Sequence, residues 1–127
     1  MFVTSIPQYI QGLTNAKLDL TTTNATVLYT APSDADFNAT IVSSILVSED
    51  SGNADTITVT ITNGTTVFSL FHVKAVGAST TIELLTRDLV LQSAEVLKVT
   101  AATANRLHVV ASVQELTKTR ISTSAVL

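Results

Sequence analysis

Cysteine and tryptophan are both absent from this chain of 127 residues, which also holds only four glycines and two prolines. Without cysteine there can be no disulfide, no zinc site built on thiolates and no cysteine nucleophile. Cysteine usage therefore leaves the redox character of the protein's compartment open.

Charged residues are also scarce, at 13% of the chain against about 25% in average soluble domains. The net charge is −3, the isoelectric point is near 5.1, and the seven lysines and arginines are scattered along the sequence. Because no stripe of cations could neutralise several phosphates together, we expect no nucleic-acid partner. Hydrophobic residues make up 46% of the chain, which indicates a globular protein rather than a disordered one.

Long apolar runs are missing as well. A representative stretch, Ile41–Val47, is interrupted by serines and is far shorter than the ~20 residues of a membrane-spanning helix. Residues 1–7 have neither a cationic start nor a long apolar run, so they do not read as a secretory signal. We therefore expect no membrane partner and synthesis in the cytoplasm.

What the chain has in abundance is threonine, serine and valine, with 22, 12 and 15 copies respectively. This composition favours β-structure, and the length fits a single domain. The clearest strand is Asp55–Thr62, where Ile57, Val59 and Ile61 alternate with four threonines. Such alternation predicts one buried face and one face that meets water.

The pair Asn63-Gly64 follows this strand and predicts a two-residue type I′ turn into a partner strand, residues 65–76. Simple alternation divides the partner into two faces. One face would hold Val67, Ser69, Phe71, Val73 and Ala75, and the other Thr66, Phe68, Leu70, His72, Lys74 and Val76.

Further short strands, with turn residues between them, are indicated along the rest of the chain. In the run from Phe37 to Ser48, Ile41 and Ile45 would share a face, and Val42 and Leu46 on the other face suggest a strand covered on both sides. The remaining expected strands are 17–22, 25–31, 80–85, 89–92, 95–101 and 106–116. The total of about eight predicts an all-β, antiparallel sandwich, jelly-roll or immunoglobulin-like.

This sandwich is expected to occupy residues 17–116. Residues 1–16 lack a sustained period of two, which favours an N-terminal arm or an irregular edge segment. Residues 117–127 are expected to form a short C-terminal tail.

Residues that could carry chemistry do not form a recognisable site. Asp34, Asp36 and Asn38 have the spacing that opens a calcium loop, but Ala39 and Ile45 stand where that loop needs glycine and glutamate. A second acidic loop, 49–55, has oxygens but no specific spacing. The two histidines, His72 and His108, would have to meet across the sheets with a third ligand to hold a metal. We expect no catalytic residue, no cofactor and no metal, and hence a protein that is not an enzyme.

The runs Ile82–Leu85, Asp88–Ala101 and Leu107–Glu115 resemble small structural proteins of tailed bacteriophages, in particular capsid decoration (cement) proteins. The resemblance covers about residues 17–116 and is one of overall pattern, since Ser93-Ala94-Glu95 replaces the Gly-Asp turn that such proteins often have. It implies a sandwich, often trimeric, that lies on the capsid surface of the virion and holds major capsid protein subunits together.

The expected partners are therefore the major capsid protein and further copies of this chain, as a homotrimer. Apolar residues near both ends of the chain are candidates for the capsid contact, because terminal segments can order on binding. Phe68 and Leu70 either pack beneath a neighbouring loop or form a subunit contact. The candidate contact residues are thus Ile6, Tyr9, Ile10, Leu13, Phe68, Leu70, Ile121, Val126 and Leu127.

Two other functions stay open. The chain could be a tail, neck or fibre-associated module of the virion that contacts host glycans through the loops 32–36 and 49–55. It could also be a jelly-roll isomerase or hydrolase, which would need a clustered metal or carboxylate site.

Overall fold

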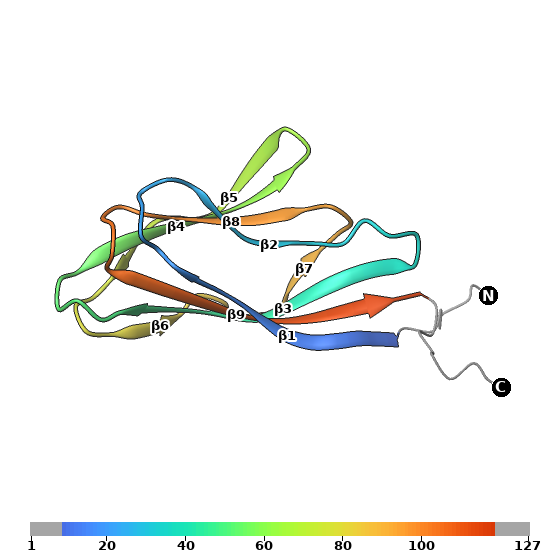
Figure 1. Ribbon diagram of the computed structural model, residues 1–127, viewed down its shortest axis with the longest axis horizontal. Helices are drawn as coiled ribbons and strands as arrows, with labels where there is room; N and C mark the ends of the chain where they lie inside the picture. Colours follow the sequence, from blue (N-terminus) through green and yellow to red (C-terminus); the bar gives the residue numbers. More distant parts are fainter. Residues whose placement is uncertain (1–8, 119–127) are drawn as a thin grey trace.

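The computed structural model describes residues 9–118, which form two antiparallel β-sheets packed face to face (Figure 1). The β-sandwich predicted from the sequence is confirmed. No helix in residues 9–118 is long and apolar enough to cross a membrane. The nine strands are β1 (Tyr9–Asp19), β2 (Thr26–Thr30), β3 (Phe37–Glu49), β4 (Asp55–Asn63), β5 (Thr66–Val76), β6 (Thr81–Glu83), β7 (Leu89–Leu91), β8 (Val96–Ala101) and β9 (Leu107–Thr117).

The first sheet has the strand order β1-β9-β3-β6, with β7 also paired to β3, and the second has the order β2-β8-β4-β5. Because β6 pairs with Leu46–Ser48 and β7 with Thr40–Val42, these two strands lie along one edge of β3 as parts of an interrupted strand. When β6 and β7 are counted as one interrupted strand, successive strands lie in different sheets at every connection except the β4–β5 hairpin. This is the eight-stranded, double-sheet pattern of a jelly roll. It differs from the immunoglobulin order, in which the first two strands share a sheet.

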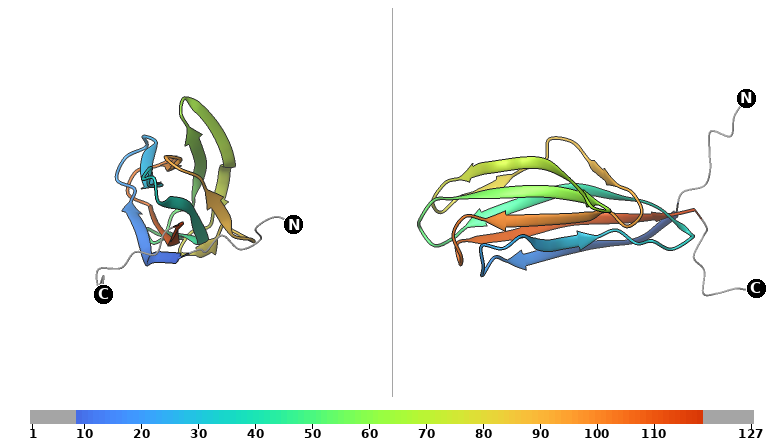
Figure 2. Two further views of the ribbon diagram at one scale, coloured as in Figure 1. Left: turned by 90° about the vertical axis from the view of Figure 1, so that its right-hand side faces the viewer. Right: turned by 90° about the horizontal axis from the view of Figure 1, so that it is seen from above.

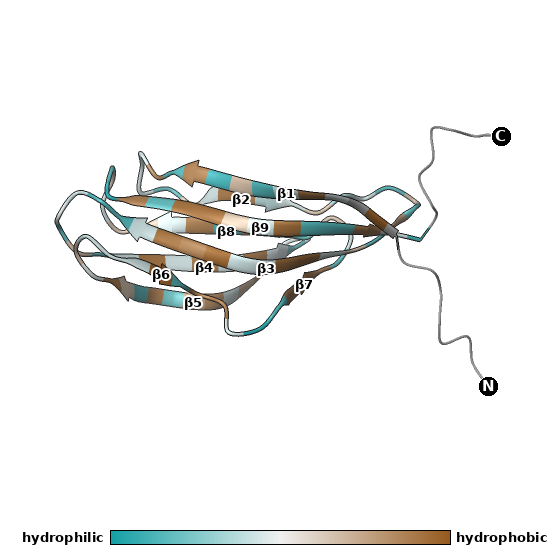
Figure 3. Cartoon of the chain, turned by 90° about the horizontal axis from the view of Figure 1, so that it is seen from below, coloured by the Kyte–Doolittle hydropathy of each residue, from teal (hydrophilic) through white to brown (hydrophobic). Residues whose placement is uncertain are grey.

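The core lies between the sheets, and the alternation along β4 and β9 places it there. Ile57 and Val59 of β4 are fully buried, and Ile61 is 9% exposed. The intervening threonines Thr56, Thr58, Thr60 and Thr62 are half-buried on the outer face, as the sequence predicts. Burying one such aliphatic side chain stabilises the fold by about 1.5–3 kcal/mol. Apolar residues are concentrated in the strands and hydrophilic residues in the connecting loops (Figure 3).

The predicted faces of β3 are wrong because the strand contains an extra residue between Val42 and Ser44 in its pairing with β9. Val42 and Ile45 are therefore both buried although they stand three residues apart, while Ile41 is only half-buried. The expectation that β3 is covered on both sides is also not met among the described residues, since Leu46 is 40% exposed on the outer face.

Residues 9–16 are not an arm: they form the first part of β1, which is an edge strand paired with β9 from Tyr9 to Asp19. A register shift between Ile10 and Gly12 makes this edge irregular, in agreement with the alternative interpretation of the segment. At the other end, Thr117 is a buried residue of β9 rather than the start of a tail. Residues 1–8 and 119–127 lie outside the described part of the chain.

The β4–β5 hairpin forms where the sequence predicts it, but its turn is of another type. Asn63 pairs with Thr66, so the two loop residues are Gly64 and Thr65. Gly64 has a φ of +63° and Thr65 is not among the residues with positive φ, which is the sign pattern of a type II′ turn rather than type I′. Like type I′, this turn suits the right-handed twist of the two strands it connects.

We predict that Gly64→Ala destabilises the fold by about 1–2 kcal/mol, because an L-residue with a side chain is strained at this positive φ. Gly12→Ala is the matched control: neither position has an atom within 4 Å of an added Cβ, and Gly12 does not have a positive φ. The control should be neutral or stabilising. Urea unfolding of both variants checks the prediction, and equal stabilities would contradict the turn geometry.

Candidate functional site

Exposed apolar side chains gather on the two long edge strands of the sandwich, β1 and β5. On β1, Ile10 is 56% exposed and Leu13 is 75% exposed; we call this pair the β1 patch. The β5 patch consists of Val67, Phe68, Leu70 and Val73, which are 36–59% exposed. The other exposed large apolar side chains of the described residues lie singly on four different strands: Val27, Leu46, Val90 and Val110.

The two patches lie on opposite sides of the molecule. β1 is an edge of the first sheet and β5 is an edge of the second, and the end-on view in Figure 2 shows them on opposite sides of the sandwich. The hairpin that carries the β5 patch also projects from the body (Figure 1). One copy of the chain can therefore present both patches to different partners at the same time.

The β5 patch is shaped by two register shifts between β4 and β5. From Ile57 to Val59, β4 advances two residues while β5 advances three, and from Val59 to Thr60 it advances one while β5 advances two. The simple alternation expected for β5 is therefore wrong. Phe68 lies opposite Ile61 and Phe71 opposite Val59, so these two phenylalanines share the inner face although they stand three residues apart.

Val73 lies within the shift between Ile57 and Val59 and has a φ of +52°, an unfavourable backbone conformation for a β-branched residue. Its backbone N–H donates a hydrogen bond to Thr58 Oγ1 at 3.0 Å, which helps to hold this conformation. The bulge leaves the Val73 side chain 53% exposed, beside the other apolar residues of the strand. Bulged edge strands are frequent at functional sites.

The structure shows the exposure of only some of the contact residues predicted from the sequence. Ile10 and Leu13 are exposed on β1, Phe68 and Leu70 are exposed on β5, and the structure brings these two pairs to opposite edges. Ile6, Ile121, Val126 and Leu127 lie outside the described residues, and so does the side chain of Tyr9. Sequence reasoning missed Val67 and Val73. Val67 lies opposite Thr62 on the outer face of β5, away from Phe68, and it is exposed there on an edge strand. Val73 lies within a register shift that no glycine or proline marks.

Glu49 is the most constrained polar residue of the acidic loop 49–55. Its side chain is 1% exposed and accepts hydrogen bonds from the backbone N–H groups of Ser51 (2.8 Å), Gly52 (3.1 Å) and Ser79 (2.9 Å), and from the Ser51 hydroxyl. Burial by itself would raise the pKa of this carboxyl, but the four donors outweigh burial and lower its pKa to about 2. The carboxylate thus ties the β3–β4 loop to the turn between β5 and β6. Its oxygens are engaged by the protein itself.

Tyr29 connects the two sheets at a place away from Glu49. Its hydroxyl donates a hydrogen bond to Glu115 Oε2 at 2.5 Å and lies 2.9 Å from Oγ1 of the fully buried Thr40. Tyr29 belongs to β2 in the second sheet, whereas Thr40 and Glu115 are paired residues of β3 and β9 in the first. Burial, and then the hydrogen bond to Glu115, raise the pKa of Tyr29 above its usual value, so the hydroxyl keeps its proton.

A cavity of about 280 Å³ lies beside the contact between Tyr29 and Glu115, and residues of the loop 32–36 line it. Three carboxylates line it, those of Asp34, Asp36 and Glu115, together with Pro32, Ala35, Phe37 and Thr117. Nevertheless, residues 9–118 contain no group of three or more His, Asp or Glu side chains placed to hold a metal ion.

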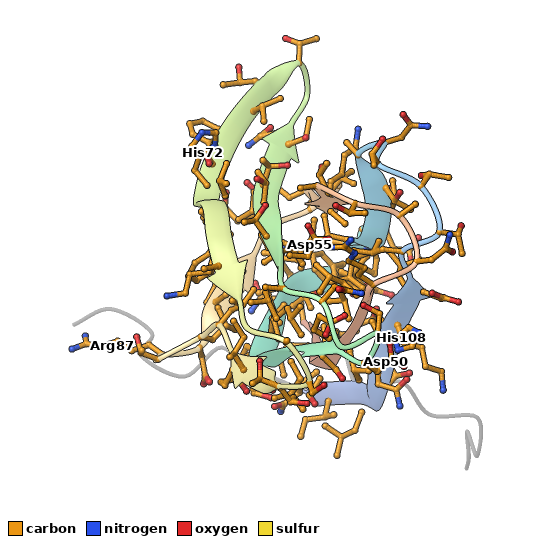
Figure 4. All side chains as sticks on the ribbon, turned by 90° about the vertical axis from the view of Figure 1, so that its left-hand side faces the viewer. Asp50, Asp55, His72, Arg87 and His108 are labelled. Carbon is orange, nitrogen blue, oxygen red and sulfur yellow. The ribbon has the colours of Figure 1, made fainter. Side chains whose placement is uncertain are left out.

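The two histidines do not meet (Figure 4). His72 is exposed on β5, whereas His108 lies between two carboxylates, with Nε2 3.3 Å from Asp19 Oδ1 and Nδ1 3.4 Å from Asp50 Oδ2. These three side chains are largely exposed. The arrangement joins β1, β9 and the end of β3 at the surface.

We predict that Glu49→Gln lowers stability at neutral pH, because an amide side chain cannot accept all four hydrogen bonds as the carboxylate does. The folded-state pKa is depressed, so the contribution of Glu49 is complete above pH 4.5 and is lost as the pH falls from about 4.5 to about 2. The difference between wild type and variant should therefore shrink across this range in urea unfolding. Asp88→Asn, at an exposed carboxylate, is the control. A difference that is the same at pH 7 and pH 2.5 would contradict this role.

We also predict that Tyr29→Phe destabilises the fold by about 1–3 kcal/mol, because it removes the hydrogen-bond partner of the Glu115 carboxylate and of the buried Thr40 hydroxyl. A double-mutant cycle with Glu115→Gln, measured by thermal unfolding, isolates the contact between the sheets. A coupling energy of zero would show that the hydrogen bond between Tyr29 and Glu115 does not contribute to the stability of the fold.

The comparisons with known proteins identify no relative. No family model, no curated protein and no solved structure matches the chain. Among the described residues, the β1 and β5 patches at opposite edges of the sandwich are the features that point most directly to a function.

Proposed function

We propose that this chain is a non-enzymatic structural protein of a tailed-bacteriophage virion that decorates the capsid surface and bridges major capsid protein subunits. The observation that carries the proposal is the placement of two apolar patches on opposite edges of one small sandwich. A protein that bridges neighbours needs two contact surfaces that face apart. The resemblance of residues 82–115 to decoration proteins supports the same function.

The physical character of the two edges suits contact with protein. An edge strand presents backbone N–H and C=O groups that can pair with another chain, and exposed apolar side chains beside them add burial. The low charge of the chain keeps the cost of removing these surfaces from water small. Each contact is modest, but many copies bound to one lattice sum to a strong effect.

Within this proposal, the β1 patch contacts the major capsid protein and the β5 patch is the contact with further copies of the chain. The resemblance implies a homotrimer. The protein would be made in the host cytoplasm and would bind assembled heads rather than free capsid subunits, because only the assembled lattice offers neighbouring subunits to bridge.

A tail, neck or fibre-associated module that contacts host glycans is the alternative function. The cavity beside the loop 32–36 favours it, since carboxylates such as Asp34 and Asp36 can accept hydrogen bonds from sugar hydroxyls. Binding on a glycan array that is lost on substitution in this loop would support the alternative.

We predict that the protein cosediments with purified phage heads and that the double substitution Ile10→Lys, Leu13→Lys weakens this binding at least about tenfold, the equivalent of about 1.4 kcal/mol. Val27→Lys, on the edge strand β2, is a matched control because Val27 is 45% exposed and lies outside both patches. Wild-type protein that stays in the supernatant with heads present would refute the proposed function.

A further inference from the structure

β5 lacks most of the features that normally protect an edge strand from pairing with another chain. Natural edges are kept short, carry charges or proline, or contain bulges. The edge strands β2, β6 and β7 have five, three and three residues, whereas β5 has 11. Its sequence, TVFSLFHVKAV, contains no proline and only one charged residue, Lys74. Lys74 and the two bulges are the protection that remains, and four large apolar side chains of the strand, Val67, Phe68, Leu70 and Val73, are exposed.

The exposed apolar residues of β5 are also arranged in part symmetrically about Leu70. Reading outward from Leu70, the strand has Ser69 and Phe71, then Phe68 and His72, then Val67 and Val73. An antiparallel partner with the same sequence would therefore place every exposed apolar residue of the β5 patch opposite an apolar or aromatic residue. Cross-strand pairs of this kind stabilise sheets.

From this we infer that β5 is a self-association edge: two copies of the chain pack antiparallel along β5 about a two-fold axis that passes through Leu70. In this register Leu70 faces Leu70, and Val67 faces Val73 of the second copy. Phe68 faces His72 of the second copy, which permits an aromatic pair. A two-fold contact of this type uses the same surface on both copies.

Charge selects the antiparallel arrangement over the parallel one. In antiparallel register Lys74 faces Thr66 of the second copy, and the two Lys74 side chains are eight residues apart along the strand, about 27 Å. A parallel pair in register would place Lys74 against Lys74, which is unfavourable.

The size of the contact predicts a weak dimer. A strand of 11 residues is about 37 Å long, and a strip about 10 Å high gives roughly 370 Å² for each copy. The total of roughly 740 Å² is below the 1,200–2,000 Å² of stable interfaces. Dimerisation in solution should therefore depend on concentration. A two-fold contact closes with two copies, so the three-fold assembly that the resemblance implies would have to use a surface other than β5. The contact does not depend on the capsid partner.

The absence of cysteine allows a direct test of the register with single-cysteine variants. Residues directly opposite in an antiparallel pair have Cα atoms about 4.5–5.5 Å apart, which lies within the range that a disulfide spans. Leu70→Cys should therefore cross-link to itself under mild oxidation. Val67→Cys and Val73→Cys should each cross-link poorly alone, because like positions are about 20 Å apart, but well when the two variants are mixed.

Leu13→Cys, on the more exposed β1 patch, is the control for random collision and should give at least tenfold less dimer than Leu70→Cys. Equal cross-linking of Leu13→Cys and Leu70→Cys, or Val67→Cys alone linking as fast as the mixture, would overturn the proposal.

Analytical ultracentrifugation without any cross-link gives the second test. Leu70→Lys should raise the dissociation constant of the dimer at least tenfold, because it places two cations on the two-fold axis, whereas Leu13→Lys should leave it unchanged. Leu70 is already 36% exposed, so circular dichroism should show an intact fold. Protein that is monomeric at its highest soluble concentration, or trimeric with no effect of Leu70→Lys, would overturn the proposal. Neither cross-linking nor ultracentrifugation measures head binding. If the dimer does not form, the proposed function still stands.

Discussion

The inner faces of the two sheets must be buried against each other, and this constraint decides which parts of the backbone remain free. Ile and Val at every second position of β4, and Leu107, Val109, Ala111 and Val113 of β9, commit both strands to the interior of the sandwich. Two stacked sheets that do not close into a barrel leave edges, and the edges here differ in length. β2, β6 and β7 are short, so the long strands β1 and β5 present most of the unpaired edge backbone in the described structure.

Polar contacts at particular points then hold the rest of the scaffold in place. The carboxylate of Glu49 fixes the β3–β4 loop to the turn before β6, and the hydroxyl of Tyr29 joins β2 to the first sheet. Both contacts are buried or half-buried, where an unsatisfied partner would be costly. A scaffold held in this way presents its two edges at a fixed separation and orientation, which a bridging protein requires.

Periodicity in the sequence was sufficient to predict the sandwich, the inner residues of β4 and the position of the β4–β5 hairpin. It failed at register shifts, because an extra residue reverses the faces of a strand without changing its composition. Phe68 and Phe71 share a face for this reason, and so do Val42 and Ile45. In β1 only the end from Lys17 was predicted as a strand, and residues 9–16 were predicted as an arm or an irregular edge segment, since an exposed edge strand need not alternate. Glu49 resembled any other acidic loop residue because its donors come mostly from the backbone.

We propose that the two long edges, β1 and β5, are the contact surfaces of the protein. Hydrogen–deuterium exchange measures this directly when free protein is compared with protein bound to phage heads. Amides of β1 and β5 should exchange more slowly in the assembled particle, while those of β8, in the middle of the second sheet, should not change. Unchanged exchange in β1 and β5, with new protection confined to the loop 32–36 or to the threonine-bearing face of β4, would contradict the account.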